Sequence, residues 1–289
     1  MKKIQLQIKT LLIVMLLFNF ISQAQQFRPN TEIGLLLGAS YYLGDLNTNH
    51  FNQPSPATGL IIRQNIDRRF VYKAEALYLN VRSDDQNPFN IRKQLDTTIT
   101  GIHFKSHIFE LSGLLEFNFL PYQPGNPLHT WTPFIYTGIS LFHFNPKAEN
   151  RTGEWVDLQS IGPEGVGTEG QGTNNWPSRR KYSLIQLAIP MGGGVKIAIN
   201  ESFNIMLEYG IRKTFTDYLD DVSTTFVGGP HGTNTYDDLM GQEAQELSDP
   251  YNLHKSGEQR GDPDKKDWYS FAGITLSFKL QKASNCPPY

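Results

Sequence analysis

The sequence predicts an all-β fold, an eight-stranded antiparallel transmembrane β-barrel with short periplasmic turns and long extracellular loops. Three observations support it: a leader typical of export, eight segments in which apolar and polar residues alternate, and connections that alternate between short and long. We expect the barrel to occupy residues 25–289 and to lie in the outer membrane of a Gram-negative bacterium, surrounded by outer-membrane lipid.

The first 24 residues have the pattern of a signal peptide. Lysines open the chain, residues 11–18 form an unbroken apolar run, and Ser22-Gln23-Ala24 matches the small-x-small pattern of a cleavage site. The apolar run is shorter than the ~20 residues that a membrane-spanning helix needs. We therefore predict cleavage near Ala24 and export of the mature chain. No later segment approaches the length of a spanning helix, so this chain would have to cross a membrane with strands.

Eight segments of the mature chain alternate between apolar and polar residues with the period of a β-strand. They are 31–43, 58–66, 70–82, 106–120, 131–145, 182–199, 202–215 and 268–280. Several exceed the ~5–6 residues typical of soluble strands and reach the ~9–11 that a tilted membrane strand needs. In the seventh segment, for example, Leu207 and Ile211 share one face while Glu208 and Arg212 share the other. The fifth segment departs from this pattern because it carries apolar residues on both faces, and no segment predicts an amphipathic helix.

Short and long connections alternate along the chain. The short ones are 67–69, 121–130 and 200–201, and the long ones are 44–57, 83–105, 146–181 and 216–267. In an antiparallel barrel this alternation places every long loop at one rim, as in outer-membrane barrels. With an even number of strands, both chain ends and the short turns are then expected on the periplasmic side.

The polar faces of these segments carry as many acids as bases. The charged residues that we place inside the barrel are Glu32, Arg63, Lys73, Glu75, Glu110, Glu116, Lys196, Glu208, Arg212 and Lys279. Eight strands enclose a space that side chains alone can fill, and charges left unpaired there would be costly. We therefore expect a neutral, polar plug, with a narrow path for solutes as the alternative. The run Gly192-Gly193-Gly194, inside the sixth segment, predicts a bulge or a tight bend where side chains would crowd.

The sequence carries no recognisable catalytic, cofactor or metal site. A formal charge of -2 and a pI near 6.4 give no basic excess for nucleic acid. The lone Cys286 excludes an internal disulfide. Ser223, His231 and Asp221 could be drawn as a catalytic triad, but geometry rather than composition defines one.

Two charged runs each allow two interpretations. The acidic run 217–221 could hold Ca²⁺. We favour a hydrogen-bonded turn at the outer rim, because aspartate readily caps its own backbone and the spaced Asp-x-Asp-x-Asp-Gly pattern is missing. The run Arg179-Arg180-Lys181 would lie at the level of the outer headgroups, where it either meets lipopolysaccharide phosphates or is simply solvated.

Two motifs resemble those of a known family. The first segment ends in Tyr41-Tyr42-Leu43-Gly44-Asp45-Leu46-Asn47, and the seventh continues through Arg212-Lys213-Thr214-Phe215-Thr216-Asp217-Tyr218-Leu219-Asp220-Asp221. Together they are similar to the PorG-like outer-membrane β-barrel family of the Bacteroidota type IX secretion system, and the similarity extends over nearly the whole mature chain. The resemblance implies structural importance for the motif residues Gly44, Asp45, Asp217, Tyr218, Asp220 and Asp221.

The same resemblance implies a non-enzymatic component of an export machine, which ties a periplasmic ring of a lipoprotein and its partner to the outer membrane. It carries over no catalytic residue, cofactor or metal. We therefore expect a scaffold or docking component of protein secretion, with partner contacts on the short turns, on residues 25–30 or on the tail 281–289. The alternatives are a narrow OmpW-like channel for small solutes and a lipid-modifying or proteolytic enzyme sited at the rim.

Overall fold

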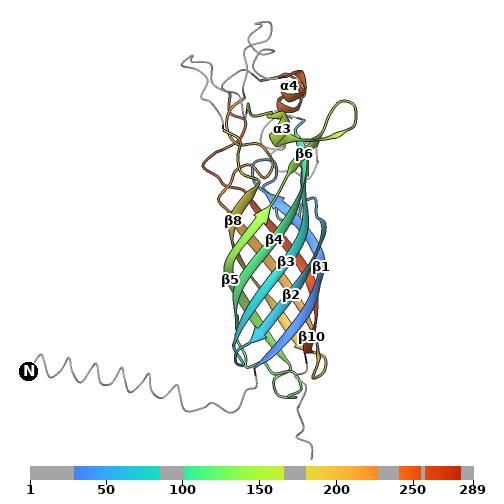
Figure 1. The fold of residues 1–289 in the computed structure, drawn as a ribbon, viewed down its shortest axis with the longest axis vertical. Coiled ribbons are helices and arrows are strands. Elements are labelled where there is room, and N and C mark those ends of the chain that lie inside the picture. The colour runs from blue at the N-terminus through green and yellow to red at the C-terminus, as the bar shows by residue number, and fades with distance from the viewer. Residues whose placement is uncertain (1–28, 85–100, 166–179, 227–240, 255–257, 281–289) are drawn as a thin grey trace, which may run out of the picture.

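The computed structural model describes residues 29–84, 101–165, 180–226, 241–254 and 258–280. The predicted signal peptide and the tail 281–289 lie outside the described residues. The described chain forms a closed antiparallel barrel that carries loops and short elements above one rim (Figure 1). We call the described parts of the four long connections the outer cap.

Eight strands form the barrel. They are β1 (Asn30–Leu43), β2 (Ser55–Asn65), β3 (Phe70–Asp84), β4 (His103–Asn118), β5 (Trp131–His143), β8 (Ile185–Ala198), β9 (Phe203–Thr214) and β10 (Trp268–Leu280). Each strand pairs antiparallel with its neighbour in sequence, and the pairing of β10 with β1 closes the sheet. The predicted fold is confirmed, and each strand end lies within three residues of its predicted place.

Side chains that bond the turn backbone close two of the short connections. The Asp67 carboxylate accepts hydrogen bonds from the N–H groups two and three residues later, at 2.6 and 2.7 Å. The Asn200 side chain does the same, at 2.8 Å to both groups. Asp and Asn favour such turns because their side chains replace a backbone carbonyl as acceptor, and the next strand then starts at once.

The connections are sorted by length between the two rims (Figure 1). The short connections lie at the rim where β1 begins and β10 ends, and the long connections gather at the opposite rim. A closed barrel with sequential pairing produces this sorting whenever short and long connections alternate along the chain.

The outer cap contains four short elements of its own. The strands β6 (Pro146–Glu149) and β7 (Trp155–Asp157) form a hairpin, and β6 also pairs with the outer end of β4. The helices α3 (Leu158–Ile161) and α4 (Gln242–Ser248) have four and seven residues. The sequence did not predict them, because such lengths are too short to show a helical period. Among the described residues, neither helix is long and apolar enough to cross a membrane.

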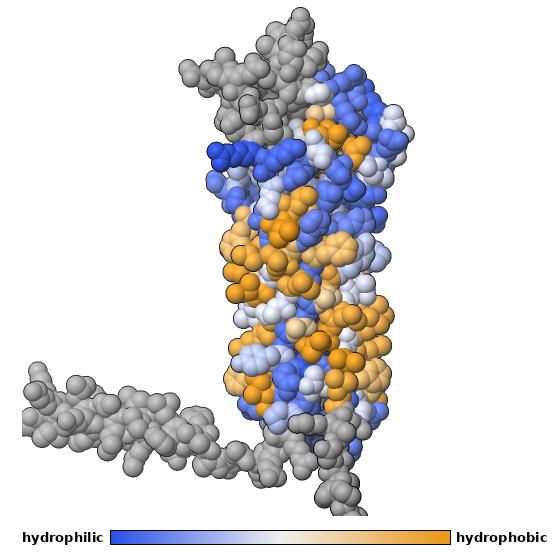
Figure 2. Space-filling view, in the orientation of Figure 1, coloured by the Kyte–Doolittle hydropathy of each residue, from blue (hydrophilic) through white to orange (hydrophobic). Residues whose placement is uncertain are grey.

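Side chains alternate between the interior and the exterior over most of the barrel, except near the outer ends of β1 and β10, where consecutive residues are buried. Leu60 and Leu111 are 65% and 64% exposed, whereas the residues beside them on the inward face are buried. Figure 2 shows hydrophobic residues over the strands and hydrophilic residues over the cap above them. A contiguous apolar surface of this kind requires an apolar surrounding or a partner.

The fifth predicted segment carries apolar residues on both faces because the interior needs aromatic rings there. Ile135 faces outwards, while Phe134 and Tyr136 are buried inside. Lysine ammonium groups lie over both rings, with Lys196 4.9 Å from the centre of Phe134 and Lys73 4.3 Å from that of Tyr136. These contacts are cation–π interactions, which combine apolar packing with stabilisation of a buried charge.

The glycine run of β8 contains no bulge, because its pairing with both neighbouring strands continues in register. Of the two predicted alternatives, a bulge and a tight bend, the pairing excludes the bulge, and the predicted crowding is confirmed. A Cβ at Gly194 would lie 1.9 Å from the Leu207 carbonyl oxygen, and one at Gly192 would lie 2.4 Å from the Tyr136 hydroxyl. The glycines therefore let the strands bend closely around the side chains inside.

Candidate functional site

Most of the charged residues that we placed inside the barrel form one continuous series of ion pairs, which we call the lumen chain. In order of contact it runs Lys196, Glu116, Arg63, Glu208, Lys73, Glu75, Arg212 and Glu110. Bases and acids alternate along it, and all of these side chains are buried. The lumen chain is therefore electrically neutral as a whole.

Glu208 shows how densely the lumen chain is bonded. Its carboxylate accepts from Arg63 at 3.2 Å and from Lys73 at 2.5 Å. At one end of the chain, the Glu110 carboxylate also accepts from the Tyr269 hydroxyl at 2.8 Å. Buried ions need such additional hydrogen bonds, because the pair attraction alone barely offsets the loss of water.

The two remaining predicted interior charges lie apart from the lumen chain. Glu32 is buried and accepts hydrogen bonds from the Asn65 amide at 2.7 Å and the Ser277 hydroxyl at 3.1 Å. Lys279 is half-buried, one residue before the end of β10 and thus at the rim of the short turns. The structure thus brings eight of the ten predicted residues together.

The lumen chain crosses the interior between strands rather than lining an open path. It joins side chains of β2, β3, β4, β8 and β9. Separating one buried pair leaves an uncompensated charge, at a cost of about 3–5 kcal/mol. The side chains therefore cannot swing aside readily, and the interior is built as a plug.

Above the lumen chain, an apolar layer continues from the barrel into the outer cap. The Phe142 ring lies 5.3 Å from Tyr269 and 5.6 Å from Phe144. Leu219 and Val222, from the connection after β9, are fully buried in the same cluster. The cap thus shares one core with the barrel and covers its mouth.

The two family-like motifs meet at this mouth, where they form what we call the rim clamp. The Tyr42 hydroxyl, near the end of β1, lies 2.5 Å from Asp220 Oδ2 and 2.8 Å from Asp267 Oδ1. Gly44 fits only as glycine, since a Cβ there would lie 1.9 Å from the Tyr42 hydroxyl and 2.0 Å from Asp267 Oδ1. Residues more than two hundred positions apart in the sequence are thereby held together.

Asp45 and Asp217 lie beside the rim clamp. Asp45 accepts a hydrogen bond from the backbone N–H of Asp262 at 2.8 Å. Burial raises the pKa of the Asp217 carboxyl to about 7, and the charge of Asp45 adds to the rise, while Ser223 and Lys266 oppose it. Near neutral pH, Asp217 therefore still binds a proton in part of the molecules, whereas an aspartate in water would be ionised.

Asp221 and Tyr218 fasten the next turn of the motif. The Tyr182 hydroxyl donates to Asp221 Oδ1 at 2.7 Å, and the Tyr218 ring stacks on the Tyr182 ring at 4.5 Å. Burial raises the pKa of Asp221 to about 7, although the nearby Arg260 guanidinium lowers it. The motif residues therefore act together in tying the connection after β9 to the barrel mouth.

An ion pair that the sequence did not predict supports this turn. Arg260 Nη1 lies 2.8 Å from Glu164 Oε1 and also donates to the Asp221 carbonyl oxygen. The same Glu164 oxygen accepts from the backbone N–H groups of Ser223 and Thr224, at 2.6 and 3.2 Å. Glu164 and Arg260 come from separate polar loops, and no periodicity marks them in the sequence.

The carboxylates of the rim hold hydrogen bonds. In the part of the chain that the structure describes, no group of three or more His, Cys, Asp and Glu side chains is arranged to hold a metal ion. Asp220 and Asp221 each accept a tyrosine hydroxyl. The run 217–221 thus contains the hydrogen-bonded turn that we expected at the outer rim, where Asp220 also accepts the backbone N–H of Val222 at 3.0 Å.

Some candidate site residues from the sequence lie outside the described residues, and the others do not form a site with one another. His231, Arg179 and Cys286 lie outside the described residues. Ser223 is buried and its backbone N–H is bonded to Glu164. Arg180 and Lys181 are exposed just before β8, at the level where the barrel meets the cap.

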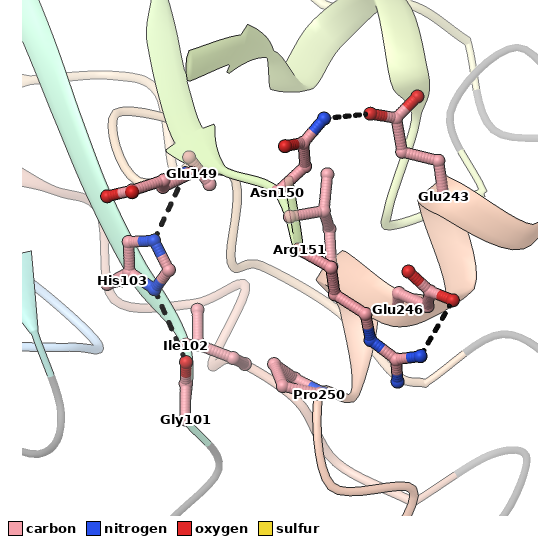
Figure 3. A pocket seen from close by; sticks show the side chains of 11 residues that line it. Gly101, Ile102, His103, Glu149, Asn150, Arg151, Glu243, Glu246 and Pro250 are labelled. Carbon is pink, nitrogen blue, oxygen red and sulfur yellow. Dashed lines mark hydrogen bonds and ion pairs between the residues drawn. The ribbon is translucent and has the colours of Figure 1, made fainter. Parts of the chain in front are cut away.

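A small pocket opens in the outer cap between β6 and α4 (Figure 3). At its rim, Arg151 Nη1 lies 3.0 Å from Glu246 Oε1, and the Asn150 amide donates to Glu243 Oε1 at 2.9 Å. His103 Nε2 accepts a backbone N–H from Glu149 at 3.1 Å, which fixes the edge of β6. The cavity measures about 140 Å³, below the ~300 Å³ at which small-molecule sites begin. Its polar contacts therefore serve to fasten α4 to the hairpin.

Solved barrels of outer membranes are similar to this chain at low identity. Neisserial surface protein A aligns with a TM-score of 0.40 and 8% identity, over 86% of this chain and 97% of that chain. The attachment invasion locus protein Ail of Yersinia pestis aligns with a TM-score of 0.39 and 7% identity, over 88% and 100%. The outer membrane enzyme PagL aligns with a TM-score of 0.30 and 11% identity, over 87% and 99%. Such likeness concerns the fold alone.

No curated protein matches the sequence significantly. One family model, described as Domain of unknown function (DUF6089), matches residues 8–160, slightly more than half of the chain. The match includes β1 to β5 with Gly44 and Asp45, and it ends before the motif 217–221. The chain therefore belongs to the DUF6089 family.

Proposed function

We propose that this protein spans the outer membrane of a Gram-negative bacterium as a sealed, non-conducting barrel and serves as a scaffold or docking component of a protein secretion machine. The observation that carries the proposal is the lumen chain, because its ion pairs fill the space that a channel would need. The apolar layer above it covers the barrel mouth a second time. A barrel plugged in this way offers its two rims to partners rather than its interior to solutes.

Insertion into a membrane is supported by the exterior of the barrel. Each of the eight barrel strands carries large apolar side chains that face outwards with 37% or more of their surface exposed. Such a surface is unfavourable in water and favourable in the hydrocarbon core of a membrane. An eight-stranded barrel leaves no sheet edge unpaired, so its backbone is compatible with lipid. The predicted signal peptide is consistent with export to that membrane.

A docking role at the periplasmic rim is supported by the longest of the short connections. Leu128, in the connection between β4 and β5, is 85% exposed, and Phe119 and Leu120 in the same connection are 47% and 40% exposed. This apolar turn lies at the rim where the chain begins, beyond the strands that lipid would surround (Figure 1). Exposed apolar side chains of this kind are typical of protein contact sites.

The resemblance of the motifs to the PorG-like family suggests the type IX secretion machine, with a periplasmic ring of a lipoprotein and its partner at this rim. To test this, a photo-crosslinking amino acid replaces Leu128 in cells, with the exposed Thr152 of the outer hairpin as the matched control site. Crosslinks from position 128 to periplasmic ring proteins, and loss of cargo export after deletion of the gene, are expected. Unchanged export, or identical crosslinks from both positions, would refute the secretion role.

Conductance separates the scaffold from a channel. In planar bilayers, the purified full-length protein should show no single-channel steps, because opening a path requires breaking buried pairs of the lumen chain. A steady conductance of the wild-type protein would overturn the sealed barrel. It would favour a narrow solute channel instead.

A further inference from the structure

The barrel exterior carries a row of three like charges just below the outer cap, which we call the basic row. Arg82 of β3 is paired with Lys105 of β4, and on the other side Lys105 is paired with Lys147 of β6. The three residues therefore lie at one level across neighbouring strands. Because the residues beside each of them on the same strand are buried, all three face outwards.

Cross-strand neighbours of like charge destabilise a sheet, and the basic row is only partly compensated. Lys147 forms an ion pair with Asp157 at 2.9 Å. The Lys105 ammonium lies over the Trp155 ring, 3.3 Å from its centre, and thus has an aromatic partner. Three bases thus face one acid at this level, and the next carboxylates on the same outward faces, Asp84 and Glu149, lie two residues nearer the cap. An anion on the barrel side of the row would relieve the remaining repulsion.

Directly below the basic row, the exterior is hollowed into an apolar groove of about 580 Å³. It lies where the small outward residue Ala76 leaves space between larger side chains. The larger side chains that border it include Leu35, Leu60, Tyr78, Phe109, Leu111 and Leu141.

His107 connects the basic row with the groove. It lies on the outward face of β4 between Lys105 and Phe109, and its Nδ1 is 2.7 Å from the Tyr78 hydroxyl. Tyr78 itself borders the groove. Along β4, the distance from Lys105 to Phe109 is four residues, roughly 14 Å, and the flexible lysine stem can shorten it. The charged surface of the basic row and the apolar surface of the groove are thus neighbours on the same outward face.

We propose that this face of β3, β4 and β6 binds an anionic lipid of the outer leaflet, with a headgroup phosphate on the basic row and an acyl chain in the groove. Guanidinium and ammonium groups bind phosphate through charge-assisted hydrogen bonds. The apolar lining of the groove suits a hydrocarbon chain. The groove lies on the side of the basic row that faces the middle of the barrel. The inference rests on the membrane-spanning part of the proposed function and is independent of the secretion role.

The occupant is a phosphorylated glycolipid of the lipid A type. The basic row lies at the rim of the long loops, which face outwards in a barrel whose chain ends are periplasmic. The outer leaflet at that rim is where phosphates and acyl chains of one molecule would meet both surfaces at once. Free phosphate would engage the basic row alone, which makes the two sources distinguishable.

The test uses the full-length protein in neutral detergent and its thermal unfolding with bis-phosphorylated lipid A, because a ligand that binds the folded state raises the unfolding temperature. The wild-type protein should be stabilised by lipid A and not by the dephosphorylated lipid. The variant Arg82→Gln/Lys105→Gln/Lys147→Gln should lose this stabilisation and bind at least tenfold more weakly. Its matched control, Arg151→Gln/Lys213→Gln/Lys265→Gln, removes the same charge from exposed positions elsewhere in the cap and near this rim and should behave as wild type.

Equal losses in both triple variants would overturn the inference, because the binding would then follow net charge alone. The groove is tested separately by Ala76→Phe, which fills it, against Ala74→Phe, an outward position on the same strand beyond the residues that line it. Ala76→Phe should weaken lipid A binding and Ala74→Phe should not. If millimolar inorganic phosphate alone reproduced the lipid A effect, the groove would have no part and the lipid assignment would fail.

The experiments test the proposed function and the lipid site separately. A difference in gel migration between the unheated and the heat-denatured protein shows that each variant is folded. Reconstitution into lipid vesicles shows that it inserts into a membrane. A folded, inserted and non-conducting protein whose lipid A binding is unaffected by the basic row would refute only the lipid site. A protein that does not insert would refute both.

Discussion

Tyr42 and Asp220 are joined by a hydrogen bond of 2.5 Å that links the end of β1 to the connection after β9. The same Tyr42 hydroxyl lies 2.8 Å from Asp267. A hydroxyl has one hydrogen and can donate to only one of these carboxyl groups, so the other contact requires a proton on the carboxyl side. Burial, with repulsion from Asp45 for Asp220 and from Asp220 for Asp267, raises the pKa of both carboxyls well above its usual range. The rim clamp therefore carries at least one protonated aspartate.

The first prediction is that the outer cap loosens as the pH rises. Asp217 has an ordinary pKa of 3.8 and a folded value of about 7. The folded state therefore binds the proton more tightly, so its stability is full below about pH 4 and falls progressively as the pH rises to 7. Hydrogen exchange of the backbone 216–223, corrected for intrinsic rates, should show at least tenfold less protection at pH 8 than at pH 5, since one pKa unit equals about 1.4 kcal/mol.

Asp217→Asn should weaken this dependence but not abolish it, because the amide does not titrate whereas Asp221, whose pKa burial also raises to about 7, still does. The matched control is Asp264→Asn, which changes an exposed aspartate of the same cap and should leave the profile as in wild type. A wild-type profile without pH dependence would show that Asp217 is already charged in the folded protein.

The second prediction concerns the lumen chain. Glu208→Gln removes a charge that faces both Arg63 and Lys73. These bases keep Glu116 and Glu75 as partners, but the lumen chain then holds one buried positive charge without compensation. We expect a loss of about 3–5 kcal/mol in the free energy of unfolding, measured by urea titration of tryptophan fluorescence in lipid vesicles. Glu201→Gln makes the same change at an exposed turn and should cost no more than about 0.5 kcal/mol. Equal effects would mean that water reaches the lumen chain.

The third prediction tests the fit of the rim clamp around Gly44. Gly44→Ala places a Cβ within 2.0 Å of both the Tyr42 hydroxyl and Asp267, so the clamp has to open. A loss of about 1–3 kcal/mol, typical of overpacking, is expected. Gly241→Ala is the control, because a Cβ there has open space around it within the same cap. Increased exchange of the cap amides in Gly44→Ala alone would locate the damage at the clamp.

The strands and their faces could be predicted because the exterior and the interior impose opposite chemistry on alternate residues. That rule places Glu208 and Arg212 inside from their neighbours alone. The rule contains no information on which acid meets which base, since pairs such as Arg63 and Glu208 form across the barrel and not along one strand. The order of the lumen chain therefore required the structure.

The contacts at the outer rim could not be predicted from sequence patterns to the same extent. The motif resemblance marked Gly44 and Asp220 as structurally important, but Asp267, which shares the Tyr42 hydroxyl with Asp220, stands alone before β10. Glu164 and Arg260 are separated by 96 positions and lie in loops without periodicity. Contacts between loops depend on where the barrel brings their ends, and no local pattern records that.

The last prediction concerns a hydroxyl that has no hydrogen-bond partner in the described interior. Tyr136 is buried, and its ring lies below the Lys73 ammonium, but its hydroxyl finds neither donor nor acceptor there. Tyr136→Phe keeps the ring and removes only the unsatisfied oxygen, so the free energy of unfolding should be unchanged or slightly higher. Tyr122→Phe is the matched substitution, because it removes a hydrogen bond of 2.8 Å to Asn204 and should cost about 1–3 kcal/mol.

Both variants are compared in the same vesicles by urea titration. A loss for Tyr136→Phe as large as that for Tyr122→Phe would mean that the Tyr136 hydroxyl is bonded to water beside the lumen chain. A hydrated interior of this kind would lower the cost of moving a charge through the barrel, because water would share the compensation of each ion. The pair of substitutions therefore measures how dry the plug is, which is the property on which a non-conducting barrel depends.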